Sequence, residues 1–185
     1  MHLSDLKYEI TSWLRFRTFR GSIKILMKLL GPTKEDIILD VGAGTGVIAN
    51  EVSKLCDEVF ALEPNIGKVE FMKRKFPTVK AFDSAAENVG FPNSYFTKVY
   101  SISAFHHFEN QDQAASEFNR VLKRGGLLLI HELHPKGSIA KLEKRHYGSS
   151  FKTPEDLEEK CESAGFKKTG FETTKQGYFL LLNKV

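Results

Sequence analysis

The sequence is poor in cysteine and has no long hydrophobic run. Its two cysteines, Cys56 and Cys161, are too few for a disulfide framework and lack the spacing of a zinc site. Both fall on the apolar face of a predicted helix, so each is expected to be a small core residue in a reducing compartment. The N-terminal region has no apolar segment as long as a secretory signal or a membrane span. We therefore expect a cytoplasmic protein with neither a disulfide scaffold nor a membrane span.

A strong charge imbalance is also lacking. The 27 Lys and Arg residues against 23 Asp and Glu leave a formal net charge of +4, which permits an acidic partner or RNA but requires neither. The proportions of hydrophobic and charged residues, 41% and 27%, are ordinary for a globular protein. With no repeat, low-complexity tract or linker, the sequence predicts a single domain over 1–185. A helical cover is expected over 1–31 and the core over 36–185.

What is present is an apolar run that passes into a glycine-rich turn, within residues 36–49. Residues 37–41 suit a buried parallel strand, and Gly42, Gly44 and Gly46 follow. Glycine lets the backbone turn tightly and approach a ligand, and the N-terminus of the next helix favours an anionic group. Strand, turn and helix together are typical of a nucleotide-binding α/β domain. The predicted helix has four side chains on one face, Ile48, Val52, Leu55 and Cys56.

Two classes of cofactor use such a turn. The dinucleotide pattern G-x-G-x-x-G has its third glycine where this chain has Val47. Asp40 instead lies two residues before the first glycine, where a carboxylate can receive an ammonium or hydroxyl group. With this acid, the stretch resembles motif I of class I S-adenosylmethionine (SAM) dependent methyltransferases. The resemblance implies that Asp40 and the backbone of residues 42–46, Ala43 included, hold the methionine part of SAM.

A second predicted strand, residues 58–62, ends at Glu63 and Pro64. Glu63 stands about 20 residues after the first glycine, where an acid at the end of the second strand can accept two ribose hydroxyls. The alternative, a surface acid at a strand end, explains the spacing less well. We therefore place Glu63 and Pro64 in the cofactor site. Asn65 can cap the next helix, whose apolar face is Ile66, Val69, Met72 and Phe76.

A loop from Asp83 to Pro92 follows a third predicted strand, 79–82. It resembles the adenine-enclosing loop of methyltransferases related to the ubiquinone/menaquinone group, which reads acid-Ala-Glu, a spacer and Leu/Phe-Pro. Ala86 and Glu87 occupy the Ala-Glu positions, whereas Asp83 stands two residues before the usual acid position. The resemblance implies that the Ala86 N–H donates to an adenine nitrogen and that Glu87 flanks the ring. The adenine N6 group then contacts Asp83 or a backbone carbonyl.

The fourth predicted strand, 98–103, leads into Ala-Phe-His-His-Phe at 104–108. Ligands of open α/β sheets sit outside the carboxyl ends of the strands, so Ser103 is expected beside the cofactor. His106 or His107 can act there as a general base, or both can be structural. Many members of the resembled family have a similar segment at this point.

Two nucleic-acid reactions are disfavoured by the residues after this strand. Methyltransferases of adenine N6 and of amide nitrogens carry Asn/Asp-Pro-Pro-Tyr/Phe there, whereas this chain has Ser-Ile-Ser-Ala at 101–104. Methylation of pyrimidine C5 needs a nucleophilic cysteine on the active face, and neither cysteine is placed for it. RNA stays open as an acceptor of another kind.

Further along, we expect a helix over 110–124, capped near Asn110, and a strand over 127–130. The next four residues, 131–134, read His-Glu-Leu-His. They alternate sides along a strand and lack the H-E-x-x-H spacing, so we predict no metal site. Glu132 or His134 can instead line a substrate pocket.

The C-terminal part predicts a basic helix over 139–146, a helix capped by Thr153, and two strands at 167–173 and 177–182. The basic helix can form a lid or a solvated surface. A closing antiparallel hairpin resembles the end of the class I methyltransferase fold.

Apolar residues at helical spacing predict two N-terminal helices, 3–17 and 23–30. These helices can simply cover one side of the sheet. In the alternative, Tyr8, Arg15 and Arg17 close over a cofactor or hold an acidic substrate.

The resemblance extends from residue 36 to the C-terminus. It implies an α/β, Rossmann-like class I methyltransferase fold, with a seven-stranded, mostly parallel sheet in the order 3-2-1-4-5-7-6, strand 7 antiparallel, flanked by helices. It also implies methyl transfer from SAM to a small-molecule acceptor by direct in-line displacement, with S-adenosylhomocysteine (SAH) as product. Phe105, Phe108 and Trp13 favour an apolar or aromatic acceptor, unless they belong to the core.

Two other functions stay open. An NAD-dependent oxidoreductase would share the glycine turn and Glu63, but Val47 and the absence of a Tyr-x-x-x-Lys pair count against it. A non-catalytic SAM-binding protein would bind the cofactor without methyl transfer, and the motifs do not distinguish it from an enzyme.

Overall fold

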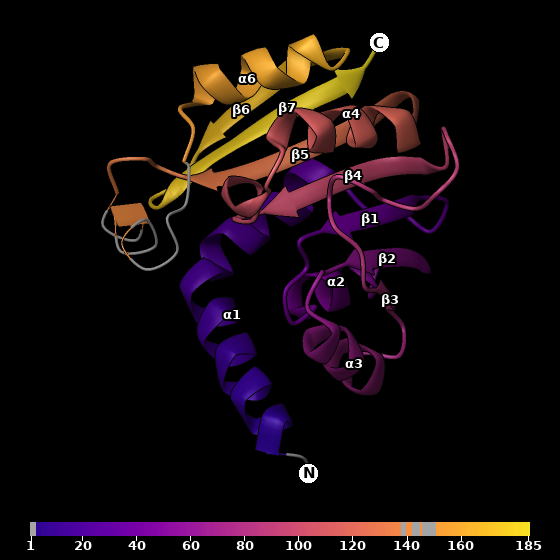
Figure 1. Cartoon of the computed structure of the whole chain (residues 1–185), viewed down its shortest axis with the longest axis vertical. Coiled ribbons are helices and arrows are strands. Elements are labelled where there is room, and N and C mark those ends of the chain that lie inside the picture. Colours follow the sequence, from indigo (N-terminus) through magenta and orange to yellow (C-terminus); the bar gives the residue numbers. More distant parts are fainter. Residues whose placement is uncertain (1–2, 138–139, 142–144, 146–150) are drawn as a thin grey trace.

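The fold is built on one seven-stranded sheet in a computed structural model that describes residues 3–137, 140–141, 145 and 151–185 (Figure 1). The strand order is β3-β2-β1-β4-β5-β7-β6. β7 runs antiparallel to both of its neighbours, and the other pairs are parallel. The predicted fold and strand order are therefore confirmed. The strands are β1 (Ile37–Val41), β2 (Glu58–Leu62), β3 (Lys80–Phe82), β4 (Phe96–Ile102), β5 (Leu122–Leu133), β6 (Phe166–Thr173) and β7 (Gly177–Lys184).

Helices cover both faces of this sheet, and the core is correspondingly divided in two. Alternation along β1 points Ile38 toward α1, α2 and α3, and points Leu39 toward α4 and α6. Figure 1 shows α1 descending along α2 and α3, while α4 and α6 lie on the far side of the strands. The helices are α1 (Leu3–Leu30), α2 (Val47–Val52), α3 (Ile66–Lys75), α4 (Gln111–Val121) and α6 (Pro154–Ser163), with a 3₁₀ turn η1 (Phe105–His107).

The N-terminal prediction of two helices is wrong, because α1 is continuous from Leu3 to Leu30. Gly21 is the residue that most weakens a helix in the region between the two predicted segments. A glycine inside a helix costs only about 1 kcal/mol relative to alanine. Phe19 and Ile23 on either side are buried against the body of the protein, and this packing keeps the helix intact.

Three helix faces and ends also differ from prediction. α2 ends at Val52, so Leu55 lies beyond it and is exposed, although Cys56 is buried as expected. Ile66 begins α3 but faces solvent. α4 ends at Val121 rather than 124. The next residue already pairs with β4, because β5 begins earlier than its apolar stretch indicates.

The predicted helix caps are confirmed. Asn65 accepts a hydrogen bond from the third residue of α3, and Asn110 does the same for α4. Thr153 and Asp156 form a reciprocal capping box at the start of α6. The predicted basic helix over 139–146 falls mostly outside the described residues. Among those that are described, no helix is long and apolar enough to cross a membrane.

Asp36 connects three segments at the end of β1 opposite to the glycine turn. Its carboxylate accepts hydrogen bonds from the Thr33 N–H at 2.9 Å, from Thr97 Oγ1 at 2.8 Å and from Lys98 Nζ at 2.7 Å. Lys98 also donates to the Gly31 carbonyl just after α1. Burial alone would raise the pKa of Asp36, but the bonds from Lys98 and Thr97 hold it below the ordinary 3.8.

We predict that Asp36→Asn lowers the free energy of unfolding by about 1–3 kcal/mol at pH 7, because a charge-assisted network is lost. The folded pKa is depressed, so this contribution is complete above pH 3.8 and disappears as the pH falls through the folded pKa. Urea unfolding of both proteins between pH 7 and pH 3 measures the difference. The control is Asp57→Asn, which changes an exposed aspartate. A difference that does not shrink in acid contradicts the role of the charge.

Candidate functional site

A cavity of about 410 Å³ lies at the carboxyl ends of β1, β2 and β4. This is the edge where ligands bind in open α/β sheets, and the volume is within the usual range for small-molecule sites. Its wall is Gly42, Gly44, Glu63, Pro64, Lys68, Ser84, Ala85, Ala86, Glu87, Ser103, Ala104, His107, Phe108 and Glu109. Eight predicted site residues are therefore brought together: Gly42, Gly44, Glu63, Pro64, Ala86, Glu87, Ser103 and His107.

The glycine turn needs glycine for both conformation and space. Gly42, Gly44 and Gly46 have φ of 75°, 62° and 76°, in the left-handed region that other residues rarely adopt. A Cβ on Gly42 would lie 2.5 Å from the Cβ of Ala104, so the turn packs directly on the segment that follows β4. Gly46 caps α2 and packs against Met72 of α3.

Glu63 extends from the end of β2 into this turn and is buried. Its Oε2 accepts the Gly44 N–H at 2.9 Å. Its Oε1 accepts the Asn65 N–H at 3.2 Å and Lys68 Nζ at 3.0 Å. The three donors stabilise a buried carboxylate and hold it at the cavity wall.

Lys68 is a cavity residue that the sequence patterns did not indicate. A carboxylate can accept about four hydrogen bonds. With three donors bound to Glu63, its Oε2 can still accept one more. Oε1 can accept a hydrogen bond from a ligand only if Lys68 moves aside. Its partly exposed side chain, on the first turn of α3, can do so.

The loop after β3 supplies a wall of the cavity through residues 84–87, and Asp83 is not part of that wall. Asp83 is exposed and borders a separate hollow with Lys80 and Phe82. Ala86 is buried at the cavity, and its neighbour Glu87 accepts the Asn110 N–H at 3.0 Å. The loop is thus attached to the start of α4.

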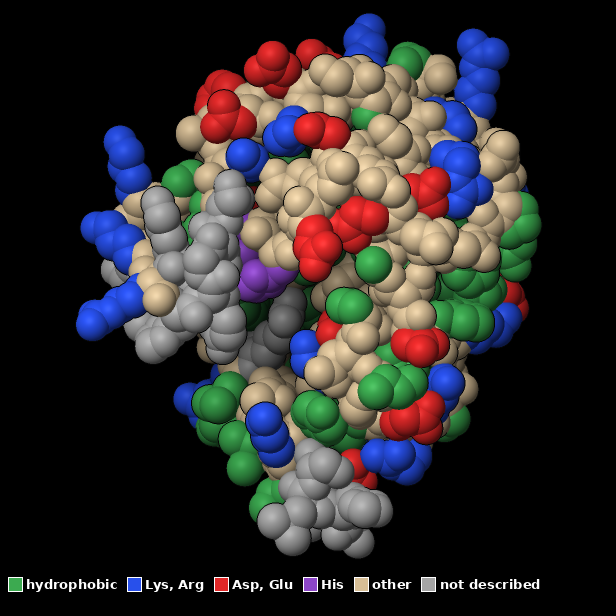
Figure 2. Space-filling model, viewed as in Figure 1, with side chains coloured by type: hydrophobic (Ala, Val, Ile, Leu, Met, Phe, Trp, Pro, Cys, Tyr) green, Lys and Arg blue, Asp and Glu red, His purple; other side chains and the backbone are tan. Residues whose placement is uncertain are grey.

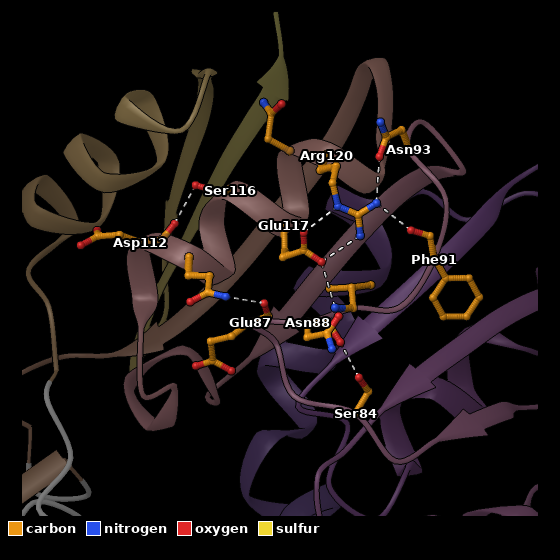
Figure 3. Close-up of polar contacts among 12 residues, drawn as sticks. Ser84, Glu87, Asn88, Phe91, Asn93, Asp112, Ser116, Glu117 and Arg120 are labelled. Atoms are coloured by element: carbon orange, nitrogen blue, oxygen red, sulfur yellow. Dashed lines mark hydrogen bonds and ion pairs between the residues drawn. The ribbon is translucent and has the colours of Figure 1, made fainter.

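Two side chains of α4 hold the rest of this loop (Figure 3). Glu117 Oε2 accepts the Val89 N–H at 3.0 Å, and Arg120 donates to the Phe91 carbonyl at 2.7 Å and to Asn93 Oδ1 at 2.9 Å. Arg120 also pairs with both oxygens of Glu117, and this bond lowers the pKa of Glu117. Periodicity placed both residues on a helix, but it could not show what they bind.

The two histidines have different environments. His107 is exposed and lines the cavity. His106 is buried, and its Nδ1 lies 2.7 Å from Oε2 of Glu132 at the end of β5. Glu132 also accepts the Phe105 N–H at 3.1 Å. Burial raises the pKa of Glu132, although its bond with His106 opposes the rise.

Two other rings pack against the ring of His106. The ring of Phe151 stacks on His106 with centroids 4.1 Å apart, and the ring of His107 lies 4.0 Å away. Phe105 belongs to the core, where it packs with Phe108 and Phe118.

Ser103 is held in a strained conformation at the end of β4, with φ of 50°. Its N–H donates to the His131 carbonyl at 2.8 Å, and its hydroxyl lies 3.0 Å from His131 Nδ1. The other ring nitrogen of His131 lies 3.4 Å from the hydroxyl of Ser22 on α1. His131 therefore connects the N-terminal helix to the cavity wall.

Other predicted residues lie outside the cavity wall. Asp40 is buried in β1 beside Tyr100, whose pKa is raised by burial and by the Asp40 carboxylate. Ala43 is buried in the turn. Tyr8 packs on Phe71, and Arg17 stacks over Trp13. The Arg15 side chain lies outside what the structure describes.

Comparison with protein families shows that residues 39–130 match the model of a methyltransferase domain. This span includes the glycine turn, Glu63, the loop after β3 and both histidines. The match supports a methyltransferase cofactor site over a dinucleotide site.

Two relatives and one solved structure illustrate the similarity. The chain is 30% identical over 116 residues to a demethylmenaquinone methyltransferase of Chlorobaculum tepidum, with 62% of this chain and 48% of the relative covered. It is 34% identical over 109 residues to a sterol 24-C-methyltransferase of Eremothecium gossypii, with 55% and 29% covered. The chain thus spans half or less of these relatives.

The structural match covers 100% of this chain and 98% of the other, with a TM-score of 0.85 and 13% identity. The matched chain comes from the complex between the Haloferax volcanii Trm112 methyltransferase activator and a methyltransferase. At this identity the likeness concerns the fold.

We predict that Glu117→Ala releases the loop after β3. Because the Val89 N–H loses its charged acceptor, its hydrogen exchange should become roughly tenfold faster or more. Exchange measured by NMR at single amides provides the readout. The control is Asp112→Ala on the same helix, which should leave Val89 unchanged. An unchanged Val89 rate in Glu117→Ala would refute the assignment.

Proposed function

Because residues 39–130 place this chain in the methyltransferase domain family, we propose that it transfers a methyl group from SAM to a small-molecule acceptor. The chain spans only part of its relatives, so the activity of the whole protein belongs to this proposal. The observation that carries it is the meeting of the Gly42–Gly46 turn and the buried Glu63 carboxylate at one cavity wall.

The cavity residues suit the parts of SAM. Glu63 has one carboxylate oxygen directed at the glycine turn and can accept ribose hydroxyls, with Lys68 moving aside. Ala86 and Glu87 form a wall suited to a flat adenine ring. Asp40 is buried beside Tyr100 and is not part of the wall, so we assign it to support of the strand that leads into the turn.

The chemistry needs little covalent help from the protein. SAM supplies a sulfonium methyl group that is already activated for displacement. The acceptor atom forms the new bond to the methyl carbon as the carbon–sulfur bond breaks, which leaves SAH. The residues of this chain orient the reactants and exclude water, a contribution that can reach about 7–11 kcal/mol.

We assign the general base to His106 rather than His107. Glu132 holds the His106 ring at Nδ1, which is the arrangement of a base oriented by a carboxylate. His106 lies outside the cavity wall and is packed by His107 and Phe151, so it would take the proton that the acceptor loses once one of these rings moves aside. His107 lines the cavity and would contact the cofactor instead.

An apolar acceptor is supported by the surroundings of His106. Phe151 stacks on its ring, and Phe108 forms part of the nearby cavity wall. Two relatives are named for a prenylated quinone and a sterol, which are both apolar. RNA would need exposed cations along the cavity mouth, and the described wall contains one lysine, Lys68.

One prediction of this function concerns the cofactor. Glu63→Ala should weaken SAM and SAH binding at least about tenfold, because hydrogen bonds to a buried carboxylate are lost. Isothermal titration calorimetry measures both affinities, and NAD(H) tests the oxidoreductase alternative. Glu70→Ala changes a half-exposed glutamate on α3, the helix that follows Glu63, and the variant should bind both ligands normally. Unchanged affinity in Glu63→Ala would remove Glu63 from the site.

Another prediction of this function concerns the base. His106→Gln should lower kcat by about 10²–10⁴ with little change in SAM affinity, and Glu132→Gln should lower kcat by a smaller factor. Labelled SAM with demethylmenaquinol and a sterol as acceptors provides the assay. His107→Gln is the matched control, with its main effect on SAM binding. SAM binding without transfer to any acceptor would favour the non-catalytic alternative.

A further inference from the structure

The outward side of α1 carries an apolar stripe that the fold does not use. Four side chains at helical spacing face solvent, although large apolar residues are usually buried. Their exposed fractions are 46% for Leu6, 51% for Ile10, 57% for Trp13 and 49% for Leu14. We call these four residues the outer stripe. Figure 2 shows hydrophobic side chains with basic ones beside them at the lower left, over α1.

The opposite side of α1 already has its packing partners. Tyr8 packs on Phe71, and the Ser12 hydroxyl donates to Thr45 Oγ1 at 2.7 Å. The buried residues of the C-terminal half join the core. The core-facing side of α1 is therefore made of other residues than the outer stripe. It is a second apolar face.

The charged side chains of α1 also differ between its two sides. Its two acidic residues are directed at α3, where Asp5 pairs with Arg74 and Glu9 pairs with Lys75, both at 2.7 Å. The exposed charged side chains that remain on the described part of α1 are all basic. Three of them, Arg17, Arg20 and Lys24, continue the line of the stripe at helical spacing. We call Lys7, Arg17, Arg20, Lys24 and Lys28 the α1 cations.

An apolar stripe with Trp and Leu beside Lys and Arg is the pattern of a helix that lies in a membrane interface. The stripe also borders a hollow of about 440 Å³ whose wall includes Phe16, Phe71 and Phe76, so the apolar surface extends beyond the helix. We propose that this side of α1 docks on the surface of an anionic lipid bilayer. The stripe enters the interface and the cations contact acidic headgroups.

Other occupants match the surface less well. A second copy of the chain would bring its own cations against these, with no outward acid on α1 to neutralise them. RNA would match the cations but gain little from Leu6, Ile10 and Leu14. An anionic bilayer satisfies the stripe and the cations together. The inference is independent of methyl transfer, since vesicle binding and SAM binding are measured separately.

The test is co-sedimentation of the full chain with vesicles of phosphatidylcholine, alone or mixed with phosphatidylglycerol. We expect binding only when phosphatidylglycerol is present, and weaker binding as salt is added. Ile10→Ser with Leu14→Ser should reduce the partition coefficient at least about tenfold. Arg20→Gln with Lys24→Gln should reduce it roughly fivefold for each cation removed.

Matched controls change similar residues elsewhere. Leu55→Ser alters an exposed leucine outside α1, and Lys123→Gln with Arg124→Gln removes two exposed cations at the start of β5. Both should bind vesicles like the unchanged protein. If the stripe variant fails to fold, the Arg20 and Lys24 variant still tests the proposal, because it leaves the apolar surface intact.

Three results would overturn the proposal. The first is no binding to vesicles that contain phosphatidylglycerol, and the second is equal binding to phosphatidylcholine alone. The third is a dimer, detected by light scattering, that the stripe variant converts to a monomer while vesicle binding is unaffected. That third result would assign the stripe to contact between copies.

Discussion

The hydrogen bond from the Gly44 N–H to Glu63 joins the first two βα units at the place where the site forms. It requires the left-handed backbone of the glycine turn, because other residues would not direct this N–H at the end of β2. It also allows a carboxylate to be buried at the cavity wall without a lost hydrogen bond. The remaining walls reach the same point because β1, β2 and β4 are parallel and end on one edge of the sheet.

Patterns within short segments predicted most of this arrangement. The limits of β2 and the helix caps at Asn65, Asn110 and Thr153 depend on neighbouring residues, and all of them are confirmed. The strand order followed from resemblance to a family, and the family prediction is confirmed by the match over 39–130. Glu63 could be selected because its spacing from the glycine turn reflects one βα unit.

The rest depends on pairs of residues far apart in the chain. Nothing near Glu117 indicates that it accepts the Val89 N–H, and nothing near Glu132 indicates a bond to His106. The end of α4 was missed for the same reason, because Leu122 leaves the helix to pair with β4. α1 was divided wrongly because its apolar residues form two sets along the sequence, 3–17 and 23–30, whereas burial of Phe19 and Ile23 against the body of the protein keeps the helix continuous.

These two kinds of contact divide the site into two halves. The residues of the cavity wall all lie within 39–130, the span that matches the family. The ring of His106, by contrast, is held by Glu132 and packed by Phe151, which both lie outside that span. Because a family match reports the residues that relatives share, it identifies the methyl donor and leaves the acceptor open. Under the proposed function, acceptor choice in this chain is therefore to be sought in β5 and in the segment that contains Phe151.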